Sequence, residues 1–311
     1  MAKRPSERLR SDRESVRAVP TATQTPATRV NDGPGGSAAT SAGSRRSIVQ
    51  LALIVAAIAL AAYAAMLGWI YVRQEALLFY PTPLPPSYAF AIPDVHEVRI
   101  DVDGASLSAL HLRLRDPKGV VFFLHGNAGN LASWFADSAF YRQANYDLFM
   151  IDYRGYGKSS GRIQSERELR ADVRKAWDFV APLYAGKRMV IYGRSLGTAL
   201  AARLAAQVQP DLTILVSPFW SAGDLARIHF PWAPAALLRY PLATNVDVRA
   251  IRTPVLLVHG ERDELIPVDN SERLLAVAPN GAILRIRGAG HNDIQEFDDY
   301  LDALARWLNE L

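Results

Sequence analysis

The chain has 311 residues, of which 50% are hydrophobic, a formal net charge of +4 and no cysteine. This length suffices for one large domain with added segments, and the lack of cysteine excludes disulfides, thiol nucleophiles and cysteine metal sites. Residues 1–46 hold nine Lys or Arg and four Asp or Glu, so the remaining 26 basic and 27 acidic residues sum to −1. Because nucleic-acid binding needs a clustered basic face, we expect no nucleic-acid partner.

The first segment, residues 1–47, is rich in Ser, Thr, Pro, Gly and Arg. Such a composition cannot bury enough apolar surface to offset its ordering entropy, so we expect a disordered basic tail. Two interpretations of the tail stay open. It is either a solvated segment without a specific role or one whose basic residues bind anionic lipid.

Residues 48–72, IVQLALIVAAIALAAYAAMLGWIYV, contain no charged side chain. About 20 apolar residues cross the hydrocarbon core of a bilayer, so this run predicts a transmembrane helix through which the protein contacts the lipid membrane. Trp69 and Tyr71 stand at its far end, where interfacial aromatic rings are expected. Arg45 and Arg46 precede the run, and the positive-inside rule then keeps the N-terminus in the cytoplasm.

This reading predicts a single-pass protein of the inner or plasma membrane whose remaining domain is extracytoplasmic. One alternative is a signal peptide cleaved after Ala62-Tyr63-Ala64, which has the small-residue pattern of a cleavage site. A buried core helix is disfavoured because the run has no polar face.

Residues 74–311 are expected to form the globular domain, which begins with a proline-rich linker around residues 83–86. Strand-like and helix-like runs then alternate, which predicts a mostly parallel sheet of eight strands with helices on both faces. The dipeptide Asp103-Gly104 predicts a hairpin between the first two strands. The expected strands are residues 98–102, 106–112, 120–124, 147–152, 189–192, 212–216, 254–258 and 282–286. The expected helices are residues 165–184, 195–207, 271–277 and 294–308.

The stretch Gly193-Arg194-Ser195-Leu196-Gly197 lies where a strand-like run becomes a helix-like one. Glycines on both sides of the serine let strand and helix pass closely, and the helix start supplies backbone N–H groups. This pattern, G-x-S-x-G between strand and helix, is typical of a nucleophile elbow. An ordinary glycine-rich turn is the alternative interpretation.

A serine nucleophile needs a base, and the base needs an acid that orients it. Asp263 follows the strand at 254–258, and His291 follows the last strand, so we expect both to lie with Ser195 at the carboxyl edge of the sheet. Glu261 and Glu264 are interpreted as solvated loop charges. Of the other histidines, His96 and His111 are expected at surface or core positions. His125 and His259 are expected to shape loops, and His229 has no definite role.

The loop HGNAGN at residues 125–130 follows another expected strand. Acyl transfer needs backbone donors for the developing oxyanion, one from the residue after the nucleophile and one from such a loop. We expect these donors to be the N–H groups of Leu196 and Asn127, with Ala128 as the second choice for the loop. A phosphate-binding loop is disfavoured because the Gly-Lys-Ser/Thr ending is missing.

The motifs HGNAGN, DYRGYGKSSG, GRSLG, SPF, HGERDELIP and GAGHND, in this order, resemble the membrane-anchored branch of the α/β-hydrolase superfamily. That branch contains abhydrolase-domain protein depalmitoylases and bacterial serine-aminopeptidase-like hydrolases. The resemblance covers residues 74–310 and includes the LLFYP stretch after the apolar run. It implies the α/β-hydrolase fold, a triad of Ser195, Asp263 and His291, and an oxyanion hole at Asn127 and Leu196.

A short cap is expected at residues 220–251, with the apolar centre IHFPWAPAALL. This centre is either a packed lid or a surface that meets an acyl chain or a membrane. In the second case Phe230 and Trp232 contact the substrate.

Together these observations predict a membrane-anchored serine hydrolase that cleaves carboxylic esters or thioesters through an acyl-enzyme, with no metal and no organic cofactor. Two alternatives stay open: a peptidase or amidase with the same triad, and a catalytically silent binding protein with this fold. A dehalogenase or epoxide hydrolase would need Asp in place of Ser195.

Overall fold

The computed structural model describes residues 38–135 and 138–311, so most of the expected tail at 1–47 lies outside the described residues. The chain divides after Ala59 into two compact units, and the helix α1 (Ala38–Leu78) contributes residues to both.

Helix α1 contains the expected apolar run. From Ser44 to Leu78 it forms a 35-residue stretch with a mean hydropathy of 2.4 over its most apolar window, none of which is buried in the protein. By length and composition this helix is able to cross a membrane. It continues to Leu78 rather than ending near Val72, because Gln74–Leu78 consists of good helix formers.

In the described part of the chain, one eight-stranded sheet has the order β10-β9-β8-β7-β4-β6-β3-β2. Strand β3 is antiparallel to both its neighbours, and the other paired strands are parallel. All eight expected strands and the hairpin between the first two are therefore confirmed. Their bounds are Val95–Val102 (β2), Ala105–Leu112 (β3), Gly119–Leu124 (β4), Tyr146–Ile151 (β6), Arg188–Arg194 (β7), Leu212–Val216 (β8), Val255–Gly260 (β9) and Gly281–Ile286 (β10).

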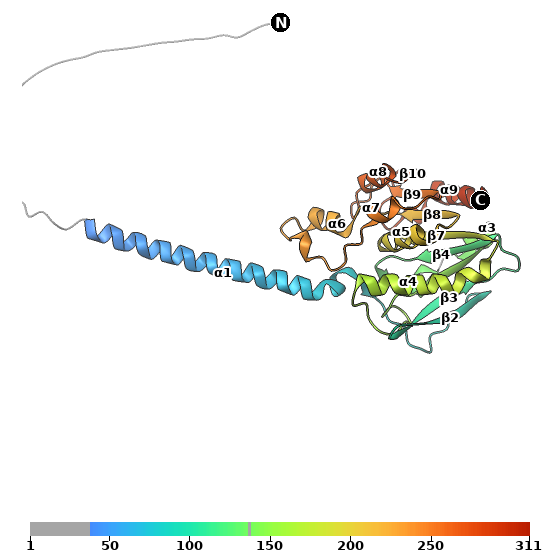
Figure 1. Cartoon of the computed structure of the whole chain (residues 1–311), viewed down its shortest axis with the longest axis horizontal. Helices are drawn as coiled ribbons and strands as arrows, with labels where there is room; N and C mark the ends of the chain where they lie inside the picture. Colours follow the sequence, from blue (N-terminus) through green and yellow to red (C-terminus); the bar gives the residue numbers. More distant parts are fainter. Residues whose placement is uncertain (1–37, 136–137) are drawn as a thin grey trace, which may run out of the picture. The chain divides into compact units, whose positions relative to one another are not determined.

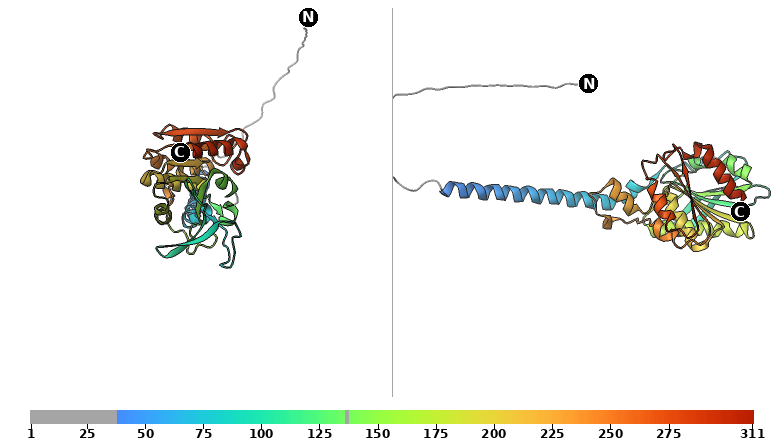
Figure 2. Two further views of the ribbon diagram at one scale, coloured as in Figure 1. Left: turned by 90° about the vertical axis from the view of Figure 1, so that its right-hand side faces the viewer. Right: turned by 90° about the horizontal axis from the view of Figure 1, so that it is seen from above.

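Helices cover both faces of this sheet (Figures 1 and 2). Helices α4 (Glu166–Val180), α5 (Leu196–Val208) and α8 (Asp269–Leu275) contribute to the apolar core of one face. Helices α2 (Leu131–Trp134), α3 (Ser138–Ala144) and α9 (Asp298–Asn309) contribute to the core of the other. Between β8 and β9 the short cap contains α6 (Ala222–His229), a 3₁₀ turn (Ala235–Leu237) and α7 (Thr244–Val248).

Several local features differ from the sequence expectations. The expected helix at 294–308 is divided at Phe297 into a 3₁₀ turn (Ile294–Glu296) and α9. The expected helix at 165–184 ends its α-helical part at Val180 and continues as a 3₁₀ turn (Ala181–Tyr184). Two short strands inside expected loops, β1 (Tyr80–Pro81) and β5 (Ala128–Gly129), pair with each other. They escaped prediction because two residues carry no periodic pattern.

The first turn of α5 packs against the sheet without room for side chains. A Cβ atom on Gly197 would lie 2.0 Å from the carbonyl oxygen of Leu124, and one on Gly193 would lie 2.6 Å from the carbonyl oxygen of Gly197. Both distances are far below van der Waals contact with backbone atoms, which cannot rotate away. The two glycines of the G-x-S-x-G stretch are therefore required by packing.

We predict that Gly197→Ala lowers the free energy of unfolding by about 3 kcal/mol or more, because the added methyl forces α5 away from β4. The midpoint of thermal unfolding of the detergent-solubilised chain measures this loss. Gly223→Ala is the matched control, since a Cβ there meets its nearest neighbour at 3.5 Å inside α6. An equal fall in both variants would contradict the packing argument.

Candidate active site

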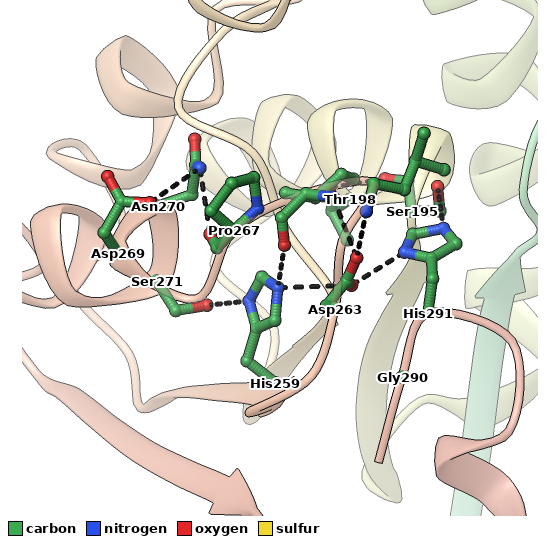
Figure 3. A network of polar contacts seen from close by, with 12 residues as sticks. Ser195, Thr198, His259, Asp263, Pro267, Asp269, Asn270, Ser271, Gly290 and His291 are labelled. Carbon is green, nitrogen blue, oxygen red and sulfur yellow. Dashed lines mark hydrogen bonds and ion pairs between the residues drawn. The ribbon is translucent and has the colours of Figure 1, made fainter. Parts of the chain in front are cut away.

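Ser195, Asp263 and His291 lie together at the carboxyl edge of the sheet (Figure 3). Ser195 directly follows β7, Asp263 follows β9 and His291 follows β10. The Nε2 atom of His291 lies 3.1 Å from the Ser195 hydroxyl oxygen, and its Nδ1 atom lies 2.7 Å from the Asp263 carboxylate. The structure thus connects the three expected residues in one chain of hydrogen bonds.

The hydrogen-bond partners define the protonation of this chain. A carboxylate only accepts, so Nδ1–H of His291 donates to Asp263 and the free Nε2 accepts from the Ser195 hydroxyl. Burial raises the pKa of the Asp263 carboxyl, but hydrogen bonds from His259, His291 and the Ile266 N–H outweigh burial and hold that pKa well below its usual range. Asp263 is therefore ionised at neutral pH.

His259 is a second histidine on Asp263, a contact that the sequence did not indicate. Its Nε2 lies 2.7 Å from the Ile266 carbonyl oxygen and 3.3 Å from the Asp263 carboxylate, and its Nδ1 accepts from the Ser271 hydroxyl at 2.7 Å. The ring is fully buried. His259 shapes the loop after β9, as expected, and also orients the carboxylate (Figure 3).

Arg194, the variable residue before the serine, is another contributor that the sequence did not reveal. Its side chain is buried and donates to the backbone carbonyl of His291 and, at 3.3 Å, to Gln295. The strand that leads into Ser195 therefore also holds the loop that carries His291.

Ser195 occupies a strained backbone conformation with φ of 50° and ψ of −116°, which is rare for a residue with a side chain. Its N–H donates to the Val216 carbonyl at 2.9 Å. Leu196 is the first residue of α5, where the backbone N–H has no partner inside the helix. The turn thus presents a hydroxyl and a helix N-terminus at one point.

The loop at residues 125–130 lies beside the serine, since a Cβ on Gly126 would be 3.7 Å from the Ser195 Cβ. Its carbonyl groups are held on one side. The Gly126 oxygen accepts from the His125 Nδ1 at 2.7 Å, and the Asn127 oxygen accepts from the Tyr80 N–H at 2.8 Å and the Tyr156 hydroxyl at 2.6 Å.

These hydrogen bonds to the carbonyl oxygens also orient the backbone N–H donors of the loop. C=O and N–H point in opposite directions across a trans peptide, so the N–H groups of Asn127 and Ala128 point away from those acceptor bonds. Burial lowers the pKa of His125 to about 4, which keeps the ring neutral while its N–H donates within the loop. The Asn127 side chain is turned toward the Leu78 carbonyl at 3.2 Å, which leaves its backbone as the group available to an oxyanion.

The segment after α1 forms part of this scaffold. Strand β1 pairs with β5 in the loop, with Tyr80 opposite Ala128 and Pro81 opposite Gly129. The Thr82 N–H donates to the Gly129 carbonyl at 3.1 Å. The LLFYP stretch is therefore a structural neighbour of the expected oxyanion donors.

A cavity of about 390 Å³ lies next to this site. Ala128 and Arg194, the sequence neighbours of Asn127 and Ser195, border it. Its wall is mainly aromatic and aliphatic and includes Phe123, Trp134, Tyr192 and Tyr300. Such a lining suits an apolar group better than a charged one.

The cap residues expected to contact substrate lie at the surface. Phe230 is 53% exposed and Trp232 is 44% exposed. The cap still reaches the site's loops, because the His229 ring lies 2.9 Å from the carbonyl oxygen of Leu265 in the Asp263 loop. Glu261 and Glu264 are exposed, as expected. Among residues 38–135 and 138–311 no group of three or more acidic, histidine or cysteine side chains is arranged to hold a metal ion.

Comparison with known proteins places the chain in a family. The family described as serine aminopeptidase, S33 matches residues 115–241. Over 268 residues the chain is 31% identical to the uncharacterized protein Rv2307c of Mycobacterium tuberculosis, covering 83% of this chain and 94% of that protein. It is 33% identical over 205 residues to the human α/β hydrolase domain-containing protein 17B, covering 62% and 67%.

Solved structures agree at the level of the fold. The Pyrococcus furiosus esterase Pf2001 superposes with a TM-score of 0.60 at 20% identity, over 75% of this chain and 97% of the esterase. The expected fold, a mostly parallel sheet with helices on both faces and an apolar helix before it, is thereby confirmed. The chain belongs to the α/β-hydrolase family, alongside the abhydrolase-domain and serine aminopeptidase-like hydrolases that its motifs resemble.

Proposed function

We propose that this protein is a membrane-anchored serine hydrolase that cleaves carboxylic esters or thioesters through an acyl-enzyme. The observation that carries the proposal is the continuous hydrogen-bond chain from the Ser195 hydroxyl through His291 to the ionised Asp263. A serine at a strained strand-to-helix turn with such partners is the arrangement that activates a hydroxyl as a nucleophile.

In the first half-reaction, the Nε2 atom of His291 takes the hydroxyl proton as the Ser195 oxygen attacks the substrate carbonyl carbon. The carbonyl oxygen gains negative charge and accepts hydrogen bonds from the N–H groups of Leu196 and Asn127. His291 then gives its proton to the departing oxygen or sulfur, which leaves an acyl-Ser195. Water, activated by the same imidazole, hydrolyses this ester and restores the serine.

An apolar acyl group is the substrate feature that the site supports best. The neighbouring cavity is lined mainly by aromatic and aliphatic side chains, and we assign Phe230 and Trp232 to contacts with the acyl chain at the cap. A peptidase or amidase with the same residues is the second candidate, because the matching family is described as a serine aminopeptidase. Turnover of an acyl ester against an aminoacyl amide separates the two.

We further propose that α1 anchors the chain, that the N-terminus is cytoplasmic and that the hydrolase domain is extracytoplasmic. The support is the charge asymmetry, with Arg45 and Arg46 directly before the apolar run.

For the orientation, alkaline phosphatase fused after Val72 is expected to be active, because this reporter folds only after export. A fluorescent reporter that requires the cytoplasm is expected to be dark at the same position. The opposite pair of results reverses the proposed orientation. A soluble fragment that begins near Ala65 would instead indicate signal-peptide cleavage.

For the triad, Ser195→Ala is expected to abolish covalent labelling by a fluorophosphonate, because no other nucleophile is proposed. His291→Ala is expected to lose nearly as much turnover, and Asp263→Asn is expected to lose on the order of ten-thousand-fold in kcat, by analogy with other triads.

The control for the triad is His259→Ala, which removes the other histidine on Asp263. This variant is expected to unfold more easily, since it leaves a buried cavity, yet to keep more activity than His291→Ala. A well-folded but inactive His259 variant beside a fully active His291 variant would show that the base is misassigned.

For the oxyanion loop, Tyr156→Phe is expected to lower kcat about three- to tenfold with KM little changed, because the Asn127 carbonyl keeps only one of its two donors. The matched control is Tyr146→Phe, which removes a buried hydroxyl that donates to the Leu308 carbonyl at 2.9 Å, away from the site. Both variants are expected to lose about 1 kcal/mol of stability. Equal activity in the two variants would remove Tyr156 from the positioning of the loop.

A further inference from the structure

The cap exposes a group of large apolar side chains that no part of the described chain covers. We define the cap tip as residues 228–232, in which Ile228 is 48%, Phe230 53% and Trp232 44% exposed. The rings of Phe230 and Trp232 pack edge to face with centroids 6.2 Å apart. Leu265, 52% exposed, lies beside them through the contact of its carbonyl with His229. These side chains form one apolar projection next to the Asp263 loop.

The base of the cap is fastened to the end of α1. The Gln74 side-chain amide donates to the Leu237 carbonyl at 2.6 Å and accepts from the Arg239 N–H at 2.8 Å. Glu75 forms an ion pair with Arg239 at 2.7 Å and accepts from the Tyr240 hydroxyl at 2.9 Å. These contacts fix where the cap begins to run along the helix.

The cap tip is bound to the same helix at a position closer to the helix N-terminus. The Tyr63 hydroxyl donates to the backbone carbonyl of Trp232 at 2.7 Å. Residues 232–239 of the cap therefore follow α1 from Gln74 back to Tyr63. Tyr63 stands ten positions before Arg73, the first charged residue after the apolar run. At an α-helical rise of 1.5 Å per residue, the tip reaches about 15 Å beyond that charge, to the level of the apolar run.

The cap changes from charged to apolar along this path, as helix α1 does from Glu75 to Tyr63. Its charged contacts, Arg239 with Glu75, lie at the polar end, while residues 230–238, FPWAPAALL, carry no charge. In hydrocarbon each unsatisfied backbone group costs several kcal/mol. Pro231 and Pro234 have no N–H, the Phe230 carbonyl accepts from the Ala233 N–H at 2.9 Å, and the Trp232 carbonyl accepts from Tyr63. The tip thus has few backbone groups that need water.

We propose that the cap tip is embedded in the lipid bilayer that α1 crosses, so that acyl substrates reach the site from the membrane along Phe230, Trp232 and Leu265. This inference rests on the proposed anchoring and hydrolase function. It names the lipid surface as the occupant of the exposed apolar patch, because Tyr63 holds the patch at the depth of the apolar run. Of the aromatic pair, Phe230 is wholly apolar, and Trp232 has the amphipathic ring that is favoured near the boundary between lipid and water.

The natural absence of cysteine makes the test direct. The full chain, carrying Phe230→Cys or Trp232→Cys, is reconstituted in phosphatidylcholine vesicles and labelled with an environment-sensitive fluorophore. Phe179→Cys and Leu183→Cys are matched controls. Phe179 is 44% exposed at the end of α4, and Leu183 is 57% exposed in the turn that leads to the first residue of β7, whereas Ser195 follows the last residue of that strand. Spin-labelled lipid is expected to quench the two cap positions and to leave the two controls bright.

A second readout is the rate of reaction of the unlabelled thiols with a water-soluble maleimide. Both cap positions are expected to react at least tenfold more slowly in vesicles than the controls. Equal rates at all four positions, or slow reaction without quenching by lipid, would overturn the inference, the latter because it indicates cover by a second copy or another protein.

Two measurements on the same samples separate this inference from the proposed function. Flotation with the vesicles reports the anchor, and fluorophosphonate labelling of Ser195 reports the triad. A chain that floats and labels but is not quenched at the cap tip refutes only the proposed embedding of the cap tip in the bilayer. A chain that does not float refutes both the proposed anchoring by α1 and the proposed embedding of the cap tip. A chain that is quenched but does not label refutes only the hydrolase assignment.

Discussion

The close approach of α5 to β4 is the constraint on which the site depends. Where Gly197 passes the ends of the strands, the Leu124 and His125 carbonyls occupy the space of a side chain. This contact fixes the start of α5, and with it the Leu196 N–H, against the strand that leads into the loop at 125–130. The Ser195 hydroxyl and the expected oxyanion donors therefore have a set separation before any substrate binds. The strained conformation of Ser195 persists because packing on both sides leaves the turn no alternative.

The ionisation of Asp263 depends on a balance between burial and hydrogen bonds. Asp263 is buried, and burial alone would favour its neutral form. Two backbone N–H groups, from Leu265 at 3.0 Å and Ile266 at 2.8 Å, and two histidine rings converge on it. Several donors on one carboxylate are enough to keep it charged, and in the proposed mechanism a charged Asp263 stabilises the imidazolium that forms at His291. In that mechanism His259 serves the ionisation of Asp263, and His291 is the ring that exchanges a proton with the serine.

The sequence was sufficient for those parts of the structure that depend on local pattern. Alternating apolar runs marked all eight main strands, and the glycine pair with the order serine, acid, histidine marked the three residues that the structure joins. The contributions of Arg194, His259 and Tyr156 were not predictable, because each acts through a partner distant in the chain or across a turn. A buried arginine that binds the His291 carbonyl looks, in sequence, like any variable residue in the motif.

The short strands β1 and β5 were missed for the same reason, and they change how the parts of the chain are connected. The segment from Tyr63 to Thr82 contacts the cap through Tyr63, Gln74 and Glu75, and then contacts the loop at residues 125–130 through β1. A linker that only tethered the domain would need none of these bonds. Because the end of α1 is continuous with β1, a displacement of that helix end would be transmitted both to the cap and to the Asn127 carbonyl. The segment from Tyr63 to Thr82 is therefore a structural part of the hydrolase domain, and its side chains belong to the framework that holds the site.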